Sequence, residues 1–306
     1  MKVIITGGAG FIGSHVTDVL ISKGIEPVVI DNLSTGRPDH LPEGIRIYQA
    51  DTVSLKMREI FAAEKPDAVI HLAAQIVVAK SLADPFGDAV QNVLGTINVL
   101  TCCRDYDVPK IIYASSSAVY GEIADGSIDE THPIRPTSFY GLSKYQGEQY
   151  VRMFHRMFGL RYTILRYANV YGPRQKSGGE GAVIPVFITK LLAGEPPVIY
   201  GSGEQTRDFV FVHDVARANW LALQRGDNTT VNIGTNIPTS IQHLYQMITH
   251  ALSSLERPVY QSKKKGDLLF SCLRNEKAKH VLGWQPSVSL AEGLKQTIRY
   301  YQQRHK

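Results

Sequence analysis

The feature that most constrains the fold of this chain is a glycine-rich turn near its N-terminus. The run Lys2–Thr6 is short, apolar and rich in β-branched residues, which favours a buried parallel strand. Residues 7–13 follow at once with the sequence GGAGFIG, and residues 14–23 then have a helical pattern. Such a turn lets backbone N–H groups and a helix N-terminus approach a diphosphate. The spacing G-x-x-G-x-x-G differs from G-x-G-x-x-G, and by itself it also fits an ordinary tight turn.

An acidic residue after the next strand narrows this interpretation. The second strand is predicted for residues 27–31, and it ends in Asp31. An acid at this place accepts hydrogen bonds from the adenosine ribose hydroxyls and repels a 2′-phosphate, so the pattern favours NAD over NADP. Asp31 could instead only begin the turn that follows. The order of strand, glycine turn, helix, strand and acid favours the cofactor.

Apolar runs and helical patterns continue to alternate along the chain. Further strands are predicted near residues 45–50, 68–72, 110–114 and 161–167, with helices between them. This alternation predicts an α/β fold with a Rossmann-type, doubly wound parallel sheet. Ligands of such sheets bind at the carboxyl ends of the strands.

The pattern changes after residue 172 to short strands and helices separated by polar loops. We therefore expect a NAD-binding Rossmann domain over residues 1–172 and a smaller C-terminal α/β substrate-binding lobe over residues 173–306. Segments at about 208–235 are expected to return to the first domain, because residues 231–233 have the pattern of a further strand of the main sheet. The two parts would then interleave.

Composition limits the class of function. The chain has 306 residues, 43% of them hydrophobic, and a net charge of +5. Its lysines and arginines are spread out, apart from residues 263–265, which suits an anionic small molecule better than a nucleic acid. The three cysteines have neither metal-site nor disulfide spacing. The N-terminus lacks the regions of a signal peptide and no apolar run is long enough for a membrane, so we expect a cytoplasmic protein.

A tyrosine and a lysine near the middle of the chain form a candidate catalytic pair. Tyr140 and Lys144 are four residues apart, so on a helix their side chains share one face. An ammonium beside a phenol favours the phenolate and can lower the pKa of the tyrosine toward neutrality. Such a tyrosine can take a proton from a substrate hydroxyl. Taken alone, the two residues also fit a solvated pair on a helix surface.

Several longer motifs carry a resemblance to a known family. They are TGGAGFIGSH at 6–15, DNLSTG at 31–36, HLAAQ at 71–75, SSSAVYG at 115–121, YGLSK at 140–144, YANVYGPR at 167–174 and YGSGEQTRDFVFVHDVA at 200–216. With these motifs the chain resembles the extended short-chain dehydrogenase/reductases, and within them the NAD-dependent sugar-nucleotide epimerases of the UDP-glucose 4-epimerase type. The resemblance covers essentially the whole length.

The resemblance implies roles for matching residues. Tyr140 is the implied base, Lys144 the residue that lowers its pKa and holds the nicotinamide ribose, and Ser116 the partner of the reacting hydroxyl. Further implied cofactor contacts are Gly7, Gly10, Phe11, Ile12, Gly13, Asp31, Asn32, Leu33, Ser34, Thr35, Gly36, Asp51, Thr52, Leu72, Ala73, Ala74, Gln75, Asn92, Ser115 and Tyr167. Further implied substrate contacts are Asn169, Ala182, Val183, Val198, Tyr200, Gln205, Arg207, Lys264, Asp267 and Ser271. An arginine is usual in relatives where Lys264 stands, and no metal is implied.

The reaction that follows from the resemblance is C4 epimerisation of a UDP-hexose through a transient 4-keto sugar, with tightly bound and recycled NAD. UDP-glucose and UDP-galactose are the first expected substrates. A bulky residue at the Ser271 position excludes N-acetyl groups in relatives, so the small Ser271 leaves room for UDP-GlcNAc and UDP-GalNAc. Relatives also form homodimers through the helices near residues 84–105 and 138–158, which makes a homodimer the expected assembly.

Other functions on the same scaffold stay open to different degrees. UDP-glucuronate 4-epimerisation is possible, because nothing in the sequence settles what contacts C6. The 4,6-dehydratases carry an Asp-Glu pair, and the UDP-glucuronate decarboxylases a glutamate, where this chain has Ser117 and Ala118, which disfavours both. A non-catalytic NAD-binding sensor is disfavoured because such proteins typically lose the tyrosine or the lysine.

Overall fold

The computed structural model describes residues 1–122, 126–177, 182–263 and 268–304. At its centre lies a seven-stranded sheet in the order β10-β6-β5-β4-β1-β2-β3, in which every neighbouring pair is parallel. The predicted doubly wound parallel sheet is thereby confirmed. The strands are β1 (Lys2–Thr6), β2 (Glu26–Asp31), β3 (Arg46–Gln49), β4 (Ala68–His71), β5 (Lys110–Ser116), β6 (Arg161–Tyr167) and β10 (Thr229–Ile233).

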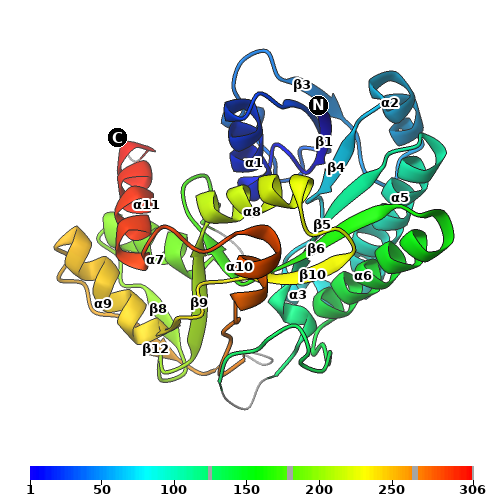
Figure 1. Cartoon of the computed structure of the whole chain (residues 1–306). Coiled ribbons are helices and arrows are strands. Elements are labelled where there is room, and N and C mark those ends of the chain that lie inside the picture. The colour runs from blue at the N-terminus through cyan, green and yellow to red at the C-terminus, as the bar shows by residue number, and fades with distance from the viewer. Residues whose placement is uncertain (123–125, 178–181, 264–267, 305–306) are drawn as a thin grey trace.

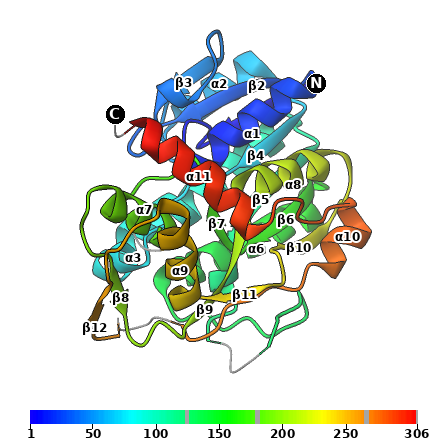
Figure 2. The ribbon, with the colours of Figure 1, turned by 90° about the vertical axis from the view of Figure 1, so that its left-hand side faces the viewer.

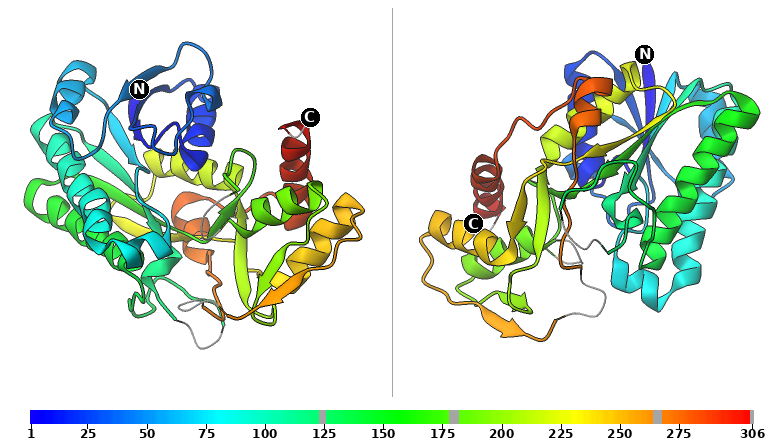
Figure 3. Two further views of the ribbon diagram at one scale, coloured as in Figure 1. Left: turned by 180° about the vertical axis from the view of Figure 1, so that it is seen from behind. Right: turned by 60° about the horizontal axis from the view of Figure 1, so that its bottom comes forward.

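Helices cover both faces of the sheet (Figure 1). On one face α1 (Phe11–Ser22) packs against α8 (Val212–Gln224), and on the other lie α2 (Lys56–Glu64), α5 (Gly95–Asp105) and α6 (Phe139–Phe158) (Figure 3). Strands buried on both faces have no alternation of apolar and polar residues. In β1, Val3 and Ile5 join the apolar cluster under α1 and α8, whereas Ile4 joins the cluster under the other three helices.

A smaller lobe lies beside this sheet (Figure 1). It contains a three-stranded sheet of β7 (Asn169–Tyr171), β9 (Thr206–Phe211) and β11 (Pro238–Ser240), and a parallel pair of β8 (Val198–Tyr200) and β12 (Val259–Gln261). The helices α7 (Val183–Leu192), α9 (Ile241–Leu252) and α11 (Leu290–Arg304) pack around a third apolar cluster, which includes Phe187, Leu244 and Ile298.

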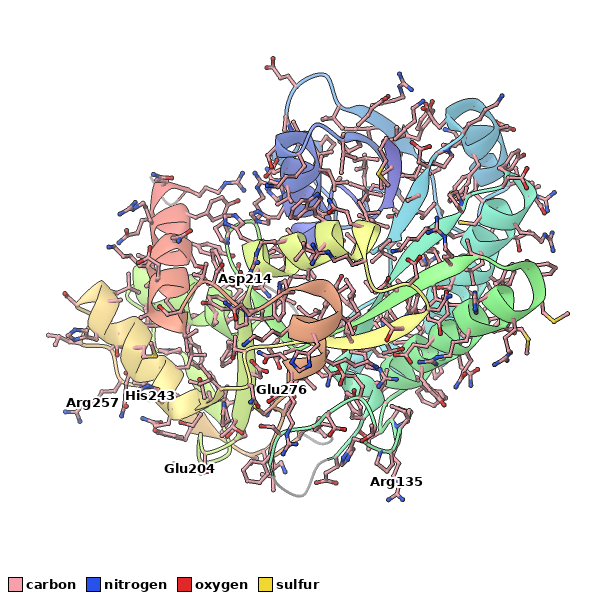
Figure 4. All side chains as sticks on the ribbon, in the orientation of Figure 1. Arg135, Glu204, Asp214, His243, Arg257 and Glu276 are labelled. Atoms are coloured by element: carbon pink, nitrogen blue, oxygen red, sulfur yellow. The ribbon has the colours of Figure 1, made fainter. Side chains whose placement is uncertain are left out.

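The two lobes interleave along the chain. After the strands of the smaller lobe have begun, β10 pairs with β6 in the main sheet, and α10 (Glu276–Leu282) packs against it. Asp214, labelled in Figure 4, lies in the first turn of α8 and accepts hydrogen bonds from both N and Oγ of Ser287. The end of α11 lies near β3 (Figure 2), and Arg304 there lies 3.7 Å from Asp39 in the connection between β2 and β3.

The region after β4 is helical, as expected for residues 84–105, with one irregularity. α4 (Pro85–Ala89), a π-helical turn (Val90–Leu94) and α5 follow one another without a break. The short helices α3 (Val78–Ala83) and α10 are not predicted at all. π-Turns inside helices often lie at functional sites.

Two further observations concern the described residues only. No helix among them is long and apolar enough to cross a bilayer. Within the same ranges, no group of three or more His, Cys, Asp and Glu side chains could hold a metal ion.

Candidate active site

The glycine turn between β1 and α1 is packed too closely for a Cβ at two of its glycines, Gly7 and Gly13. Gly7 has φ of 71°, and a Cβ there would lie 2.8 Å from the backbone nitrogen of Ala73, just after β4. A Cβ on Gly13 would lie 2.1 Å from the carbonyl oxygen of Gly7. No side chain caps the start of α1 at Gly10. The first N–H groups of the helix and the bare turn therefore fit a diphosphate group.

Asp31 ends β2 directly beside this turn. Its carboxylate accepts hydrogen bonds from the N–H groups of Ala9, at 3.0 Å, and Leu33, at 2.8 Å. Burial raises the pKa of Asp31, and the two N–H groups oppose that shift. The Asp31 carboxylate thus stabilises the turns on either side of it. It also lies where the sequence predicts a contact with the cofactor ribose.

The other predicted cofactor residues lie largely along the same edge of the sheet. Residues 32–36 follow β2, Asp51 and Thr52 follow β3, and residues 72–75 follow β4. The side-chain amide of Asn32 donates to the Asp51 carboxylate at 2.9 Å, so the segments after β2 and β3 meet. An adenosine-sized ligand can lie across these strand ends.

Asn92, in the π-helical turn, uses its side chain mainly for contacts within the protein. Its Oδ1 accepts from the N–H of Gln75 at 2.8 Å, and its Nδ2 donates to the carbonyl oxygen of Gln75 at 2.9 Å. The same Nδ2 lies 3.0 Å from the hydroxyl of Ser143, on α6. Asp88 accepts from the Gln75 amide at 2.8 Å. Together these bonds attach the segment after β4 to the helix that carries Tyr140.

Two predicted cofactor residues also turn their side chains toward the protein. The hydroxyl of Ser115 donates to Glu148 at 2.6 Å, and the phenol of Tyr167 donates to Asn219 at 3.0 Å. Both residues are buried. Contacts of either residue with a cofactor would therefore involve the backbone.

The structure brings Tyr140 and Ser116 together. Ser116 ends β5, and Tyr140 lies in the first turn of α6, whose N-cap Ser138 accepts a hydrogen bond from Gly141. The Ser116 hydroxyl favours the charged form of the Tyr140 phenol and so lowers its pKa. Ser116 and Tyr140 therefore lie together at the carboxyl edge of the sheet.

The predicted low pKa of Tyr140 is not found. Desolvation by burial raises the pKa of the phenol above its ordinary value, and the negative charge of Asp88 raises it further. Ser116 opposes both effects. Burial outweighs Ser116 in this structure, and the expectation that Lys144 lowers the pKa of Tyr140 stays a prediction.

Lys144 is itself buried, with 4% of its surface exposed. Burial lowers the pKa of its ammonium to about 8, while Glu148 and Asp88 act in the opposite direction. Its Nζ lies 4.6 Å from the centre of the Tyr113 ring. The sequence predicts a shared helix face for Tyr140 and Lys144, and on this face Lys144 is buried whereas Tyr140 stays partly exposed.

His71, at the end of β4, has the environment of a packed histidine. Its Nδ1 lies 2.6 Å from the hydroxyl of Thr6, and its Nε2 lies 3.1 Å from the hydroxyl of Thr96. Burial, with the nearby charge of Lys144, lowers the pKa of the ring to about 3. A neutral imidazole in this position supports the floor of the site.

The predicted substrate residues come from both lobes. Asn169 begins β7, Ala182 and Val183 lie at the start of α7, Val198 and Tyr200 belong to β8, and Gln205 and Arg207 lie at β9. The Gln205 amide donates to the carbonyl oxygen of Tyr200 at 2.7 Å, which joins β9 to β8. Lys264 and Asp267 lie outside the described residues.

Ser271 is 5% exposed and lies in an extended segment between the lobes. Just before it, the carbonyl oxygen of Leu269 accepts from Thr206 of β9 at 2.9 Å. Just after it, the N–H of Leu273 donates to Asp208 at 3.1 Å. Asp208, fully buried, also accepts from the N–H and hydroxyl of Thr235. This carboxylate fixes the segment that carries Ser271.

Sequence reasoning missed several residues that support the site. Glu148 lies four residues after Lys144 and so shares its helix face, a spacing that could have been recognised. Arg166 is a charge inside the apolar strand 161–167, which is a second usable signal. Asp88 and Tyr113 reach the site only through tertiary packing, and no local pattern marks them.

The comparisons with known proteins agree with this geometry. The model of the NAD dependent epimerase/dehydratase family matches residues 3–234. A UDP-glucose 4-epimerase of Thermotoga maritima, solved with UDP-glucose, is 43% identical, with both chains fully covered and a TM-score of 0.98. The Thermus thermophilus UDP-glucose 4-epimerase, solved with NAD, is 37% identical, with 99% of each chain covered and a TM-score of 0.94.

A third solved structure is a UDP-N-acetylglucosamine 4-epimerase of Methanobrevibacter ruminantium, in complex with UDP-N-acetylmuramic acid. It is 35% identical, covers 99% of this chain and 98% of its own, and has a TM-score of 0.94. The family match spans well over half of the chain, and these similarities span nearly all of it. This chain therefore belongs to the NAD-dependent epimerase/dehydratase family.

Proposed function

We propose that this protein is a UDP-hexose 4-epimerase that interconverts UDP-glucose and UDP-galactose. The observation that carries the proposal is that Ser116, at the end of β5, and Tyr140, in the first turn of α6, lie at the carboxyl edge of the sheet, with Lys144 buried one helical turn further along. Positions 117 and 118 hold serine and alanine, so the acids that dehydratases and decarboxylases use are absent from them. The similarity to UDP-glucose 4-epimerases over the whole chain supports the same assignment.

The residues of this chain supply proton transfer and orientation. Tyr140 accepts the proton of the sugar 4-hydroxyl, and Ser116 orients the reacting oxygen. When bound, NAD, the cofactor of this family, would supply an acceptor for the hydride lost from C4 of the sugar and a donor that gives it back to the 4-keto sugar. When the sugar has turned over, Tyr140 returns its proton. The positive charge of Lys144 favours the phenolate during this cycle.

The cofactor position follows from the glycine turn. Gly7, Gly8 and Gly13 form a turn without room for a Cβ, and Asp31 lies beside it with a carboxylate for the ribose hydroxyls. We propose residues 1–172 as the NAD-binding domain, joined by later segments near 208–235, and residues 173–306 as the UDP-sugar-binding lobe. Arg207 can grip the diphosphate with its fork of donors.

A product assay tests the proposed function. Purified protein is incubated with UDP-glucose, UDP-galactose, their N-acetylated analogues, UDP-glucuronate and dTDP-glucose, and the products are separated by chromatography. We expect UDP-glucose to yield UDP-galactose, and UDP-galactose to yield UDP-glucose, without added NAD. A dehydrated or decarboxylated product, or epimerisation of UDP-glucuronate alone, would contradict the proposal.

Ser271 is proposed to admit N-acetylated sugars. Replacing Ser271 with tyrosine places a ring where a small hydroxyl now lies in a buried segment. We expect kcat/KM for UDP-GlcNAc to fall by roughly tenfold or more, while UDP-glucose changes by less than about threefold. Ser271→Ala, which keeps the space, should retain both activities. Equal rates of Ser271→Tyr and the unchanged protein on UDP-GlcNAc would refute this role.

An apolar stripe on α6 supports a homodimer. Leu142, Tyr150, Met153 and Met157 are 38–65% exposed and lie opposite the helix face that packs on the sheet. We expect Met153→Glu to shift the protein toward monomers in analytical ultracentrifugation, because a carboxylate would be buried in the interface. Leu255→Glu, at a site 96% exposed in the smaller lobe, is the control. An unchanged dimer in Met153→Glu would exclude this face.

The cytoplasm is the proposed location. The cysteines at 102, 103 and 272 are unpaired, which is compatible with a reducing compartment.

A further inference from the structure

The buried ammonium of Lys144 rests on an aromatic ring. Its Nζ lies 4.6 Å from the centre of the Tyr113 ring, within the range of a cation–π contact. Among the described residues, no ion pair includes Lys144. The two carboxylates that act on it from a distance have other partners: Glu148 binds Arg166, and Asp88 accepts from Gln75. The ring is therefore the direct support of the charge.

Tyr113 is itself held firmly under the catalytic helix. It lies in β5 and is fully buried. Its hydroxyl donates to the backbone carbonyl oxygen of Lys144 at 3.3 Å. A Cβ on Gly147 would lie 2.0 Å from this hydroxyl, so the helix has a glycine where the phenol approaches it. One side chain thus contacts Lys144 at both its ammonium and its backbone.

An aromatic support has a different electrostatic result from a carboxylate. A carboxylate in direct contact would hold the lysine but cancel most of its field. The face of a neutral ring attracts the cation and leaves the net charge unchanged. That remaining charge is what a developing phenolate at Tyr140 requires.

We propose that Tyr113 is a positioning residue for Lys144, its ring face keeping the ammonium charged and in place while its hydroxyl fixes α6 at that residue. This inference rests on the proposed role of Lys144 in the reaction. The ring is the part that acts on the charge, and the hydroxyl acts on the backbone. Replacements that separate the two parts therefore test the proposal.

Nuclear magnetic resonance of lysine side chains gives a readout that does not depend on activity. In protein labelled with ¹³C-lysine, the Cε signal of Lys144 is assigned by its loss in Lys144→Met. We expect its Cε protons to be shifted upfield by the ring in the unchanged protein and in Tyr113→Phe, and to lose that shift in Tyr113→Leu. The pKa of Lys144 should fall in Tyr113→Leu by roughly 0.4 to 1.5 units, because the support of the cation is lost.

Kinetics provide the second readout. Tyr113→Phe should keep most of kcat, whereas Tyr113→Leu should lower kcat by on the order of 3- to 30-fold with a smaller change in KM. Tyr162→Leu removes a buried tyrosine from the same apolar cluster without contact to Lys144, and it controls for general loss of packing. We expect its Lys144 signal and its pH profile to match those of the unchanged protein.

If Tyr113→Leu does not fold, two side chains of nearly equal shape at position 113 provide the test instead. Phenylalanine and trifluorophenylalanine at position 113 fill the same space, but fluorine weakens the negative ring face. A lower Lys144 pKa and a lower kcat with the fluorinated ring support the proposal. Identical Lys144 pKa values for both rings would overturn it. If the unchanged protein makes no epimer, the proposed function fails, and the magnetic resonance titration still decides the role of Tyr113.

Discussion

Replacing Tyr140 with phenylalanine is expected to lower kcat for UDP-glucose epimerisation by about 10²- to 10⁴-fold, the range that a positioned general base contributes. The change removes one hydroxyl, the partner of Ser116, and leaves the ring in place. Retention of NAD is expected, because the glycine turn and Asp31 lie on other elements. The measurement is the initial rate of product formation, with the NAD content of the purified protein determined in parallel.

Tyr145→Phe is the matched control for this change. Tyr145 lies on the same helix, five residues after Tyr140, and is partly buried against the core. We expect it to keep the rate of the unchanged protein. A Tyr140→Phe protein that retains NAD and also keeps more than about a tenth of the rate would remove Tyr140 from the role of base.

Replacing Glu148 with glutamine is expected to reduce the free energy of unfolding by about 3–5 kcal/mol, the typical cost of breaking a buried ion pair. The Glu148 carboxylate is fully buried and accepts two hydrogen bonds from Arg166, at 2.8 and 2.7 Å. Arg166 is 3% exposed, so the change leaves a buried cation without its counter-charge. Urea denaturation followed by circular dichroism gives the free energy.

Two further variants separate the charge from the packing. Arg152 lies at the rim of the pair, with its side chain 23% exposed. Replacing it with alanine should lower the free energy of unfolding by less than about 1 kcal/mol. The double variant Glu148→Leu/Arg166→Met removes both charges and should recover much of the loss, since apolar residues of similar volume often replace buried ion pairs well. A loss in the double variant as large as in Glu148→Gln would show that packing, not the unpaired charge, determines the effect.

The parts of the site that local patterns encode were predictable from the sequence. The glycine turn, Asp31 and the pair Tyr140 and Lys144 each depend on spacing within one strand or one helix turn, which a sequence displays directly. The parallel order of the strands followed from the alternation of strand and helix, because parallel strands need crossover helices.

The environment of these residues was not predictable in the same way. The phenol pKa of Tyr140 depends on burial and on Asp88, which reaches it from another helix. The π-helical turn at residues 90–94 contains Asn92, whose side chain forms hydrogen bonds with Gln75 and Ser143. Both partners are distant from Asn92 in the sequence. Spacing along the chain does not report such contacts, since they exist only when the elements have packed.

The late return of β10 to the main sheet has a consequence for the making of this protein. Until residues 229–233 have been synthesised, β6 is the outermost strand of the sheet, and five of the residues that β10 later covers, Thr163–Tyr167, are buried in the finished fold. An unprotected apolar strand edge is a template for aggregation. Fragments that stop at residue 172 should therefore precipitate, and a ribosome-bound chain of that length should recruit chaperones. Any attempt to graft a different sugar-binding lobe must keep residues 229–233 in the recipient.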